Sequence, residues 1–468
     1  MTVSEFSLEV GQNRFLSRVD THMHAVLKVR ARDVDGPAVR PSAEVLVVDC
    51  SSSMDWPPTK IANARKAAAA AVDALPDGTW FALVEGTDEA TMRYPDTPRL
   101  VPADARTRQR AKAAAGHLVA IGATAMSTWL SLARDLLDTR PDAVRHALLL
   151  TDGRNESEPA SVLHRVLDEC EGRFTCDARG IGDDWEPEDL RRIAGVLRGT
   201  ADAVVEDADL PAEFRRLIRS ATDKAVPDLR LRLVTPAFAR LESIRQVAPA
   251  DIDLTDRVVA VKPGVVEVST GAWGEEAREF FLTLAVDMRG RPRFEDLQLG
   301  RVELVPPDAS VRVPAAPTPI LGHLTEDVRL STRIDEDVER YTVQADLGQR
   351  LKAGWVRFGE DDHQGAVAEW GEAVRLATQL GNTEILRRLG RLVDIDPDSG
   401  EVTLKDDIRP RDGFAAVLSL ASAATSDTPV TPEAVPGGQP RQCPDCPELS
   451  PPDAQFCMHC GHRFEVAP

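Results

Sequence analysis

The segment that most constrains the fold is an apolar run that ends in an acid and two hydroxyls. Residues 45–48 are all apolar, and Asp49-Cys50-Ser51-Ser52-Ser53 follows directly. A short, uninterrupted apolar run is typical of a buried strand in a parallel sheet. Binding sites in open α/β sheets form just beyond the carboxyl ends of strands, which is where Asp49, Ser51 and Ser53 would lie. Their hard oxygen atoms suit a small hard cation such as Mg²⁺.

Two later segments add to this set of oxygen ligands. Thr124 lies in a loop before an amphipathic helical pattern, and Asp152 follows a second apolar run. The combination of Asp-x-Ser-x-Ser with a distant Thr and a distant Asp resembles the metal-ion-dependent adhesion site (MIDAS) of the von Willebrand factor A (VWA) family. The resemblance implies direct metal contacts from Ser51, Ser53 and Thr124. It gives Asp49 and Asp152 a direct or water-mediated role and leaves the sixth position open for a carboxylate from a partner protein.

Two other interpretations of the Asp49 turn stay open at this point. The turn could be a simple N-cap for the following helix, because Asp and Ser are favoured there. It could also carry a phosphoryl-transfer aspartate, but Ser51 stands where a second acid would be expected and no clear catalytic lysine is visible. Since the sequence also shows no phosphate-binding loop and no catalytic triad pattern, we expect a binding protein and not an enzyme.

Residues 43–222 alternate between strand-like and helical segments. This rhythm predicts a doubly wound, Rossmann-like α/β domain, and it covers the whole of the VWA fold. The basic stretch 60–66 is interpreted as a solvated helix face. The predicted strands lie at 45–49, 80–85, 90–94, 147–151, 174–181 and 203–206, and the predicted helices at 60–75, 106–118, 127–137, 160–170, 187–197 and 211–220.

Strand-like alternation flanks this domain on both sides. Residues 1–40 contain two predicted strands, and residues 226–310 contain several short ones separated by Pro, Gly and Asp. The latter pattern is typical of a β-sandwich. A lone hairpin is marginal in water, so the N-terminal strands are expected to pair with later ones. The predicted fold class is therefore multidomain α/β, with the VWA domain inserted in, or followed by, a β-sandwich.

The pattern changes again after residue 325. Apolar residues recur at helical spacing over 325–395, which predicts a small helical bundle or a single hairpin of tetratricopeptide type. Residues 396–441 are rich in Asp, Ser, Thr, Pro and Gly and are predicted to form a linker, although a short helix over 413–424 is compatible with the composition.

The C-terminal residues 442–466 carry two Cys-x-x-Cys pairs, formed by Cys443 with Cys446 and by Cys457 with Cys460. This spacing predicts a zinc ribbon with a four-cysteine Zn²⁺ site. The zinc would be structural, since no coordination position is left open, and it would supply most of the folding energy of so small a module.

The net charge and the lengths of the apolar runs limit the partners and the location that we expect. The 468 residues carry a net charge of −20, which argues against a general nucleic-acid binder because such proteins depend on Lys and Arg. No apolar run approaches the length of a membrane span, and no signal-peptide pattern is visible, so a cytoplasmic location is expected.

Together these features predict an Mg²⁺-dependent protein-interaction scaffold. An intracellular VWA domain with a zinc ribbon resembles bacterial VWA proteins linked to tellurite-resistance-type systems, which implies an adaptor that works with a Ser/Thr kinase and a PP2C-type phosphatase. The alternative is the VWA partner subunit of a MoxR- or chelatase-type AAA+ ATPase.

Overall fold

The computed structural model describes residues 4–32, 41–224, 226, 228–309, 311–396, 402–418, 441–442 and 449–450. The chain divides into two compact units, residues 1–424 and 425–468. In the second unit, β22 (Arg441–Gln442) pairs with β23 (Leu449–Ser450) in antiparallel fashion. All four cysteines of the predicted zinc ribbon lie outside the described residues, so the ribbon stays a prediction.

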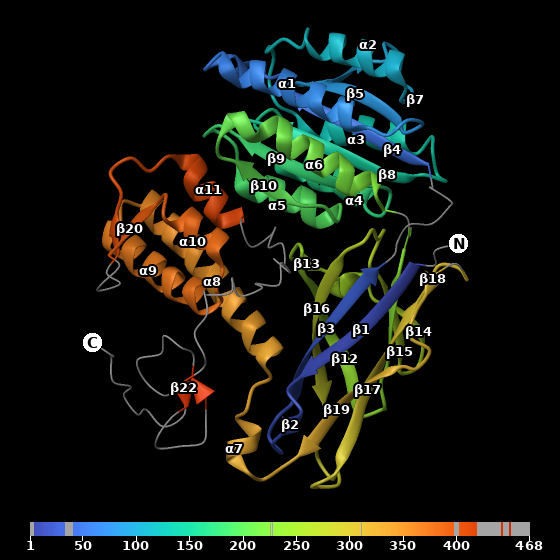
Figure 1. Cartoon of the computed structure of the whole chain (residues 1–468), viewed down its shortest axis with the longest axis vertical. Coiled ribbons are helices and arrows are strands. Elements are labelled where there is room, and N and C mark those ends of the chain that lie inside the picture. Colours follow the sequence, from blue (N-terminus) through green and yellow to red (C-terminus); the bar gives the residue numbers. More distant parts are fainter. Residues whose placement is uncertain are drawn as a thin grey trace. The chain divides into compact units, whose positions relative to one another are not determined.

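Residues 42–222 form an α/β domain around a mixed sheet (Figure 1). The strand order is β10-β9-β8-β4-β5-β6, with β7 paired to β5. The first five strands in that order are parallel to their neighbours, whereas β6 and β7 run antiparallel to β5. The strands are β4 (Ser42–Asp49), β5 (Trp80–Gly86), β6 (Ala90–Tyr94), β7 (Val101–Pro102), β8 (Val144–Thr151), β9 (Thr175–Ile181) and β10 (Ala201–Val204).

Helices cover both faces of this sheet because the central strand is apolar on both sides. Val45 and Val47 of β4 pack into one core, while Leu46 and Val48 pack into the other. The first core includes side chains of α3 (Met126–Leu137), α4 (Ala160–Cys170) and α5 (Pro187–Val196), and the second includes side chains of α1 (Thr59–Ala74), α2 (Ala105–Ala115) and α6 (Leu210–Thr222). The prediction of a doubly wound, Rossmann-like domain is confirmed.

Two six-stranded sheets are built from the chain on either side of this domain, and they share one apolar core. The strand orders are β13-β12-β16-β3-β1-β18 and β14-β15-β11-β17-β19-β2. The strands are β1 (Ser4–Gln12), β2 (Phe15–Leu16), β3 (His22–Arg32), β11 (Arg230–Val234), β12 (Ala239–Ala248), β13 (Ile252–Asp253), β14 (Val259–Lys262), β15 (Val265–Ser269), β16 (Ala277–Val286), β17 (Asp296–Val305), β18 (Val311–Arg312) and β19 (Thr318–Leu324).

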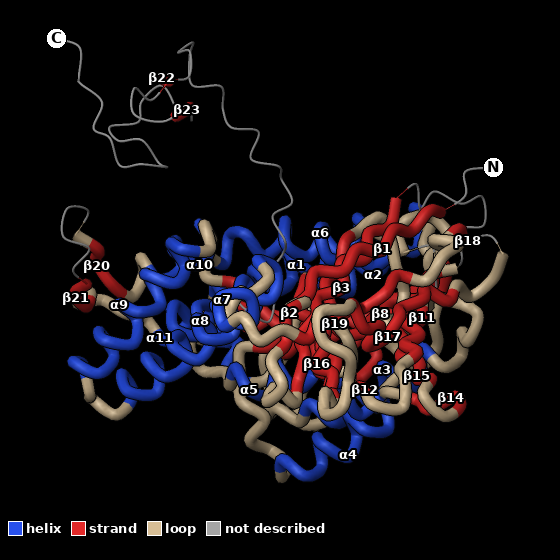
Figure 2. Tube along the Cα trace, turned by 90° about the horizontal axis from the view of Figure 1, so that it is seen from below, coloured by secondary structure: helices blue, strands red, loops and turns tan. Residues whose placement is uncertain are grey.

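The N-terminal strands depend on strands that follow the α/β domain in sequence. β3 lies between β1 and β16, and β2 pairs with β19 (Figure 2). The α/β domain is therefore an insertion between β3 and β11. The sheets also extend beyond residue 310, to Leu324. The sequence does not predict this last strand, because proline is depleted from strands and the segment contains Pro317 and Pro319.

Helices follow the sheets: α7 (Val328–Ser331), α8 (Glu336–Gly359), α9 (His363–Gln379) and α10 (Thr383–Leu389). Side chains of α8, α9 and α10 share one core centred on the fully buried Trp370. A Cβ added at Gly354 would lie 2.3 Å from the Trp370 Nε1, so glycine is what allows α8 to approach α9 this closely. No helix among the described residues is long and apolar enough to cross a bilayer.

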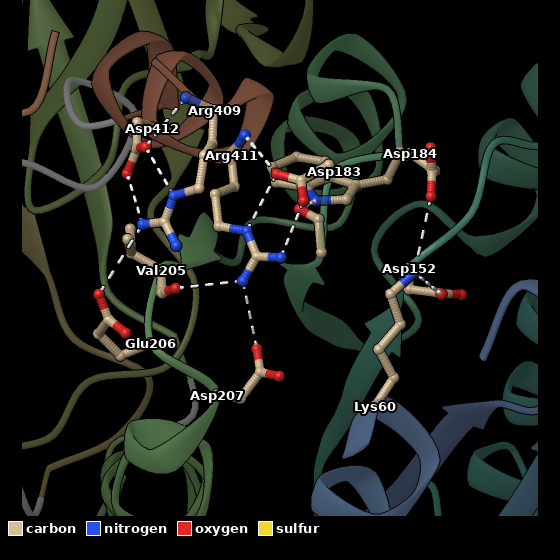
Figure 3. A network of polar contacts seen from close by, with 12 residues as sticks. Lys60, Asp152, Asp183, Asp184, Val205, Glu206, Asp207, Arg409, Arg411 and Asp412 are labelled. Atoms are coloured by element: carbon tan, nitrogen blue, oxygen red, sulfur yellow. Dashed lines mark hydrogen bonds and ion pairs between the residues drawn. The ribbon is translucent and has the colours of Figure 1, made fainter. Parts of the chain in front are cut away.

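The predicted linker over 396–441 is wrong for residues 402–418. β21 (Val402–Leu404) pairs with β20 (Val393–Ile395), and α11 (Pro410–Leu418) packs on the α/β domain. Phe414 joins the core of that domain, with its ring 4.8 Å from the ring of Trp185. Arg411 donates two side-chain hydrogen bonds to Asp183 at 3.0 and 2.8 Å (Figure 3). Charged residues of this segment therefore form ion pairs within the fold.

We expect Phe414→Ala to destabilise the protein by about 3 kcal/mol, because it empties a buried aromatic position. The matched control is Phe294→Ala, since Phe294 is 66% exposed and should contribute little. Denaturant unfolding measures the loss, and limited proteolysis should detect new cleavage within 402–418. Equal stability of the two variants would contradict the docking of α11.

A buried charge cluster crosses the α/β sheet at its other end. His146 of β8 lies between Glu44 of β4 and Asp177 of β9, with its ring nitrogens 2.7 Å from Glu44 Oε2 and 3.1 Å from Asp177 Oδ2. Burial alone would lower the pKa of His146, but the two carboxylates outweigh burial and raise it to about 9. The imidazolium form is therefore part of the folded state at neutral pH.

This cluster predicts that the folded protein loses stability at alkaline pH. Because the pKa of His146 is higher in the folded state than its ordinary value of 6.5, the stabilisation is complete below pH 6.5 and is lost as pH rises through about 9. The melting temperature should therefore fall between pH 7 and 10 by more in the wild type than in His146→Gln. His117→Gln, at an exposed position, should retain the wild-type profile. Parallel profiles for wild type and His146→Gln would refute the assignment.

Candidate metal site

The predicted ligands come from three loops at one edge of the α/β sheet. Asp49 ends β4, and Asp152 directly follows β8, so the two acids are close because these parallel strands are neighbours. Ser51 and Ser53 lie at the start of the short 3₁₀ turn that follows β4. The loop that carries Thr124 is tied to that turn through Gly122, whose carbonyl accepts hydrogen bonds from the backbone N–H of Ser52 at 3.0 Å and from its hydroxyl at 2.7 Å.

The structure brings the five predicted side chains together. The hydroxyls of Ser51 and Ser53 are 2.9 Å apart, and Ser53 Oγ donates to Asp152 Oδ1 at 2.7 Å. A Cβ added at Gly153 would lie 3.1 Å from Thr124 Oγ1, 3.2 Å from Ser53 Oγ and 3.8 Å from Asp49 Oδ2. Oxygen atoms from three loops thus converge on the small space beside Gly153.

The first acid is fully buried and held in place. Asp49 Oδ1 accepts a hydrogen bond from the backbone N–H of Ser51 at 2.8 Å, and Oδ2 accepts one from the hydroxyl of Thr151 at 2.6 Å. Burial and the nearby charge of Asp152 raise the pKa of Asp49 to about 6, although these hydrogen bonds oppose the shift. Burial likewise raises the pKa of Asp152. Two buried carboxylates that repel each other favour a cation between or beside them.

Lys60 is the site residue that the sequence interpretation missed. It was expected on a solvated helix face, but its side chain is 5% exposed and its Nζ lies 2.7 Å from Asp152 Oδ2. Lys60 is near the first turn of α1, which begins beside the Ser51–Ser53 turn, so the long side chain can reach back to the strand ends. No periodicity in the sequence marks this contact, because it depends on the spatial relation of α1 to β8.

The oxygen ligands of the cluster suit a hard divalent cation. The converging groups are hydroxyl and carboxylate oxygens, which Mg²⁺ and similar ions prefer. Cys50 packs into the apolar core behind the turn, where burial raises the pKa of its thiol, so it does not compete as a ligand. Within the described residues there is no cluster of three or more His, Cys, Asp or Glu side chains with metal-binding spacing. The oxygen cluster beside Gly153 contains only two acids.

Three residues of the oxygen cluster, Ser51, Ser53 and Thr124, line an open hollow of about 510 Å³. The rim is contributed partly by Arg154 and Glu156, both exposed, and by Asp184 of the β9–α5 loop. Large apolar side chains are also exposed on the neighbouring loops, with Trp56 79% exposed and Ile121 65% exposed. These loops adjoin the ligand turn, since the backbone N–H of Trp56 donates to Ser53 and that of Ile121 donates to Cys50.

Comparison with known proteins identifies the fold and its relatives. The profile of the von Willebrand factor type A domain matches residues 43–203. A solved structure described as von Willebrand factor type A from Catenulispora acidiphila is 36% identical with a TM-score of 0.81, and the match covers 90% of this chain and 97% of that one. The chain belongs to the von Willebrand factor type A family. The α/β domain is its VWA domain.

More distant relatives share less. Inter-alpha-trypsin inhibitor heavy chain H4 of Homo sapiens is 31% identical over 185 residues, which cover 37% of this chain. An uncharacterized protein of Synechocystis sp. is 25% identical over 254 residues. The chain spans 19% and 56% of the lengths of these two curated relatives. The ArnB paralog VWA2 from Sulfolobus acidocaldarius, with 13% identity and a TM-score of 0.50 over 89% of this chain, shares the fold.

Proposed function

We propose that this protein is a metal-dependent interaction scaffold whose VWA domain binds an acidic residue of a partner protein. The observation that carries the proposal is the convergence of five oxygen-bearing side chains, of which Ser51, Ser53 and Thr124 line an open hollow. VWA domains commonly mediate protein–protein interactions, which supports a binding role over a catalytic one.

The five oxygen-bearing residues would have two kinds of contact with the metal ion. Ser51, Ser53 and Thr124 would hold Mg²⁺ or a similar ion directly, and Asp49 and Asp152 would hold it directly or through water. A bound ion supplies a positive centre with room for one more oxygen ligand. The hollow is open at the surface, so a protruding side chain of a partner can enter it directly.

The loops beside the hollow favour a protein partner over a free small acid. Trp56 and Ile121 are exposed on these loops, and an interface with a partner would remove both from water. Aromatic residues of this kind are frequent anchors in protein interfaces. The partner segment would therefore combine a carboxylate for the metal with apolar side chains for Trp56 and Ile121.

Two partner classes follow from the predicted domain organisation. The first is a Ser/Thr kinase with a PP2C-type phosphatase, as in tellurite-resistance-type systems, and the second is a MoxR- or chelatase-type AAA+ ATPase. The first partner class also rests on the predicted zinc ribbon, in which Cys443, Cys446, Cys457 and Cys460 would bind Zn²⁺. The net charge of −20 supports protein partners over nucleic acid.

Metal binding is tested with two neighbouring serines. Ser53→Ala removes a hydroxyl from the oxygen cluster. Ser52→Ala removes a hydroxyl outside the cluster and keeps the backbone hydrogen bond from Ser52 to the Gly122 carbonyl. Mn²⁺ should raise the melting temperature of the wild type and of Ser52→Ala, and raise that of Ser53→Ala much less, with Kd weakened at least about tenfold. Differential scanning fluorimetry and calorimetric titration give the two values. Indifference of the wild type to Mn²⁺ would refute the metal site.

The partner is tested by capture from native lysate with the same variants. A partner that uses the site should be retained by wild type and Ser52→Ala in Mg²⁺, and be lost in EDTA or with Ser53→Ala. Mass spectrometry then separates the classes, since a kinase and phosphatase support the first and a hexameric ATPase supports the second. Retention that ignores both metal and Ser53 would contradict a metal-dependent scaffold.

A further inference from the structure

Lys60 occupies a place that the fold has built for it. Its Nζ lies 2.7 Å from Asp152 Oδ2, 3.4 Å from the carbonyl of Ser53 and 3.6 Å from Asp184 Oδ2 (Figure 3). The β9–α5 loop passes over it at Gly182, where a Cβ would lie 2.8 Å from Lys60 Cε. Gly182 also has φ +72°, a conformation that glycine adopts without cost. Any larger residue at this point would displace the ammonium group.

The contact divides the two oxygens of Asp152 between different partners. Oδ1 accepts from the hydroxyl of Ser53, on the side of the oxygen cluster, while Oδ2 is taken by Lys60. Both side chains are buried, at 0% exposure for Asp152 and 5% for Lys60, so solvent screens this pair weakly. Asp152 is therefore held in one orientation by the ammonium group of Lys60.

The same contact sets the charge of the site. Among the buried groups, ionised Asp49 and Asp152 contribute two negative charges, and Lys60 cancels one of them, which leaves a single net negative charge. Asp184 is 73% exposed, so solvent screens its charge. With a divalent ion bound, the ion and these buried groups would carry one net positive charge. A site of two carboxylates without the lysine would be neutral in that state and would attract a partner carboxylate less.

We infer that Lys60 is a positioning residue that holds Asp152 as an outer, water-mediated ligand and lowers the affinity of the site for divalent ions, so that the bound ion keeps a net positive charge for a partner carboxylate. This inference rests on the proposed function, because it concerns the same metal site. It assigns a role to a residue outside the five-residue ligand set.

The test is Mn²⁺ affinity of the full-length protein with Lys60→Met, which keeps most of the side-chain volume and removes the charge. Loss of a nearby positive charge should tighten Mn²⁺ binding by about tenfold or more. Lys66→Met is the matched control, since Lys66 is on the same helix, is exposed and has its Nζ 3.5 Å from Asn63 Oδ1. It should bind Mn²⁺ as the wild type does.

A second pair of variants tests the water-mediated role of Asp152. Asp152→Asn alone removes the buried carboxylate that faces Lys60 and should weaken Mn²⁺ binding by about a hundredfold, because the buried groups then have no net negative charge. The double variant Lys60→Met/Asp152→Asn restores the net charge of the wild type and should bind Mn²⁺ within about threefold of it. A double variant as weak as Asp152→Asn would show that the carboxylate is a direct ligand and would overturn the inference.

The outcomes separate the two proposals. If wild type and all variants fail to bind Mn²⁺, the proposed function fails. If wild type binds and Lys60→Met binds no more tightly, the inference alone fails. Melting temperatures measured in EDTA confirm that each variant is folded before titration. If Lys60→Met does not fold, Lys60→Arg, which keeps the charge, replaces it as the comparison. The Mn²⁺ affinity of Lys60→Arg should stay at the wild-type value, and tighter binding would overturn the inference.

Discussion

Two buried carboxylates at the ends of neighbouring parallel strands are the constraint on which this structure depends. Asp49 and Asp152 are both fully buried, and a buried charge is costly unless it is paired or hydrogen-bonded. The surrounding loops meet that cost with the backbone N–H of Ser51, with hydroxyls from Ser53 and Thr151, and with the ammonium of Lys60. Much of the architecture of this edge of the sheet follows from the need to stabilise these two acids.

The rest of the unit holds that edge firmly. Apolar side chains on both faces of β4 fix the strand between two helical layers, and the turn that carries the serines begins where the strand ends. The β9–α5 loop connects the site to α11, because Asp184 faces Lys60 while its neighbour Asp183 is bound by Arg411. A helix more than two hundred residues away in sequence thus supports the loop that closes over the lysine.

The VWA domain and the meeting of the five oxygen-bearing side chains could be predicted because both depend on local signals. Apolar runs followed by Asp49 and Asp152 mark strand ends, and strand ends of a parallel sheet meet at one edge. Lys60 could not be predicted, since a lysine on an alanine-rich helix has the same local signature whether it faces solvent or an acid. The pairing of β3 with β16, and the docking of Phe414, depend on contacts distant in sequence, and the polar residues around Phe414 resembled a linker.

The most direct test of the account is anomalous diffraction from crystals of the full-length protein soaked in Mn²⁺. The account predicts an anomalous peak among the side-chain oxygens of Ser51, Ser53 and Thr124, with Lys60 still bound to Asp152 Oδ2. A peak that displaces Lys60 and binds both oxygens of Asp152 would contradict the role given to the lysine. The lack of any peak beside Gly153, in crystals where that face is open to solvent, would contradict the metal site itself.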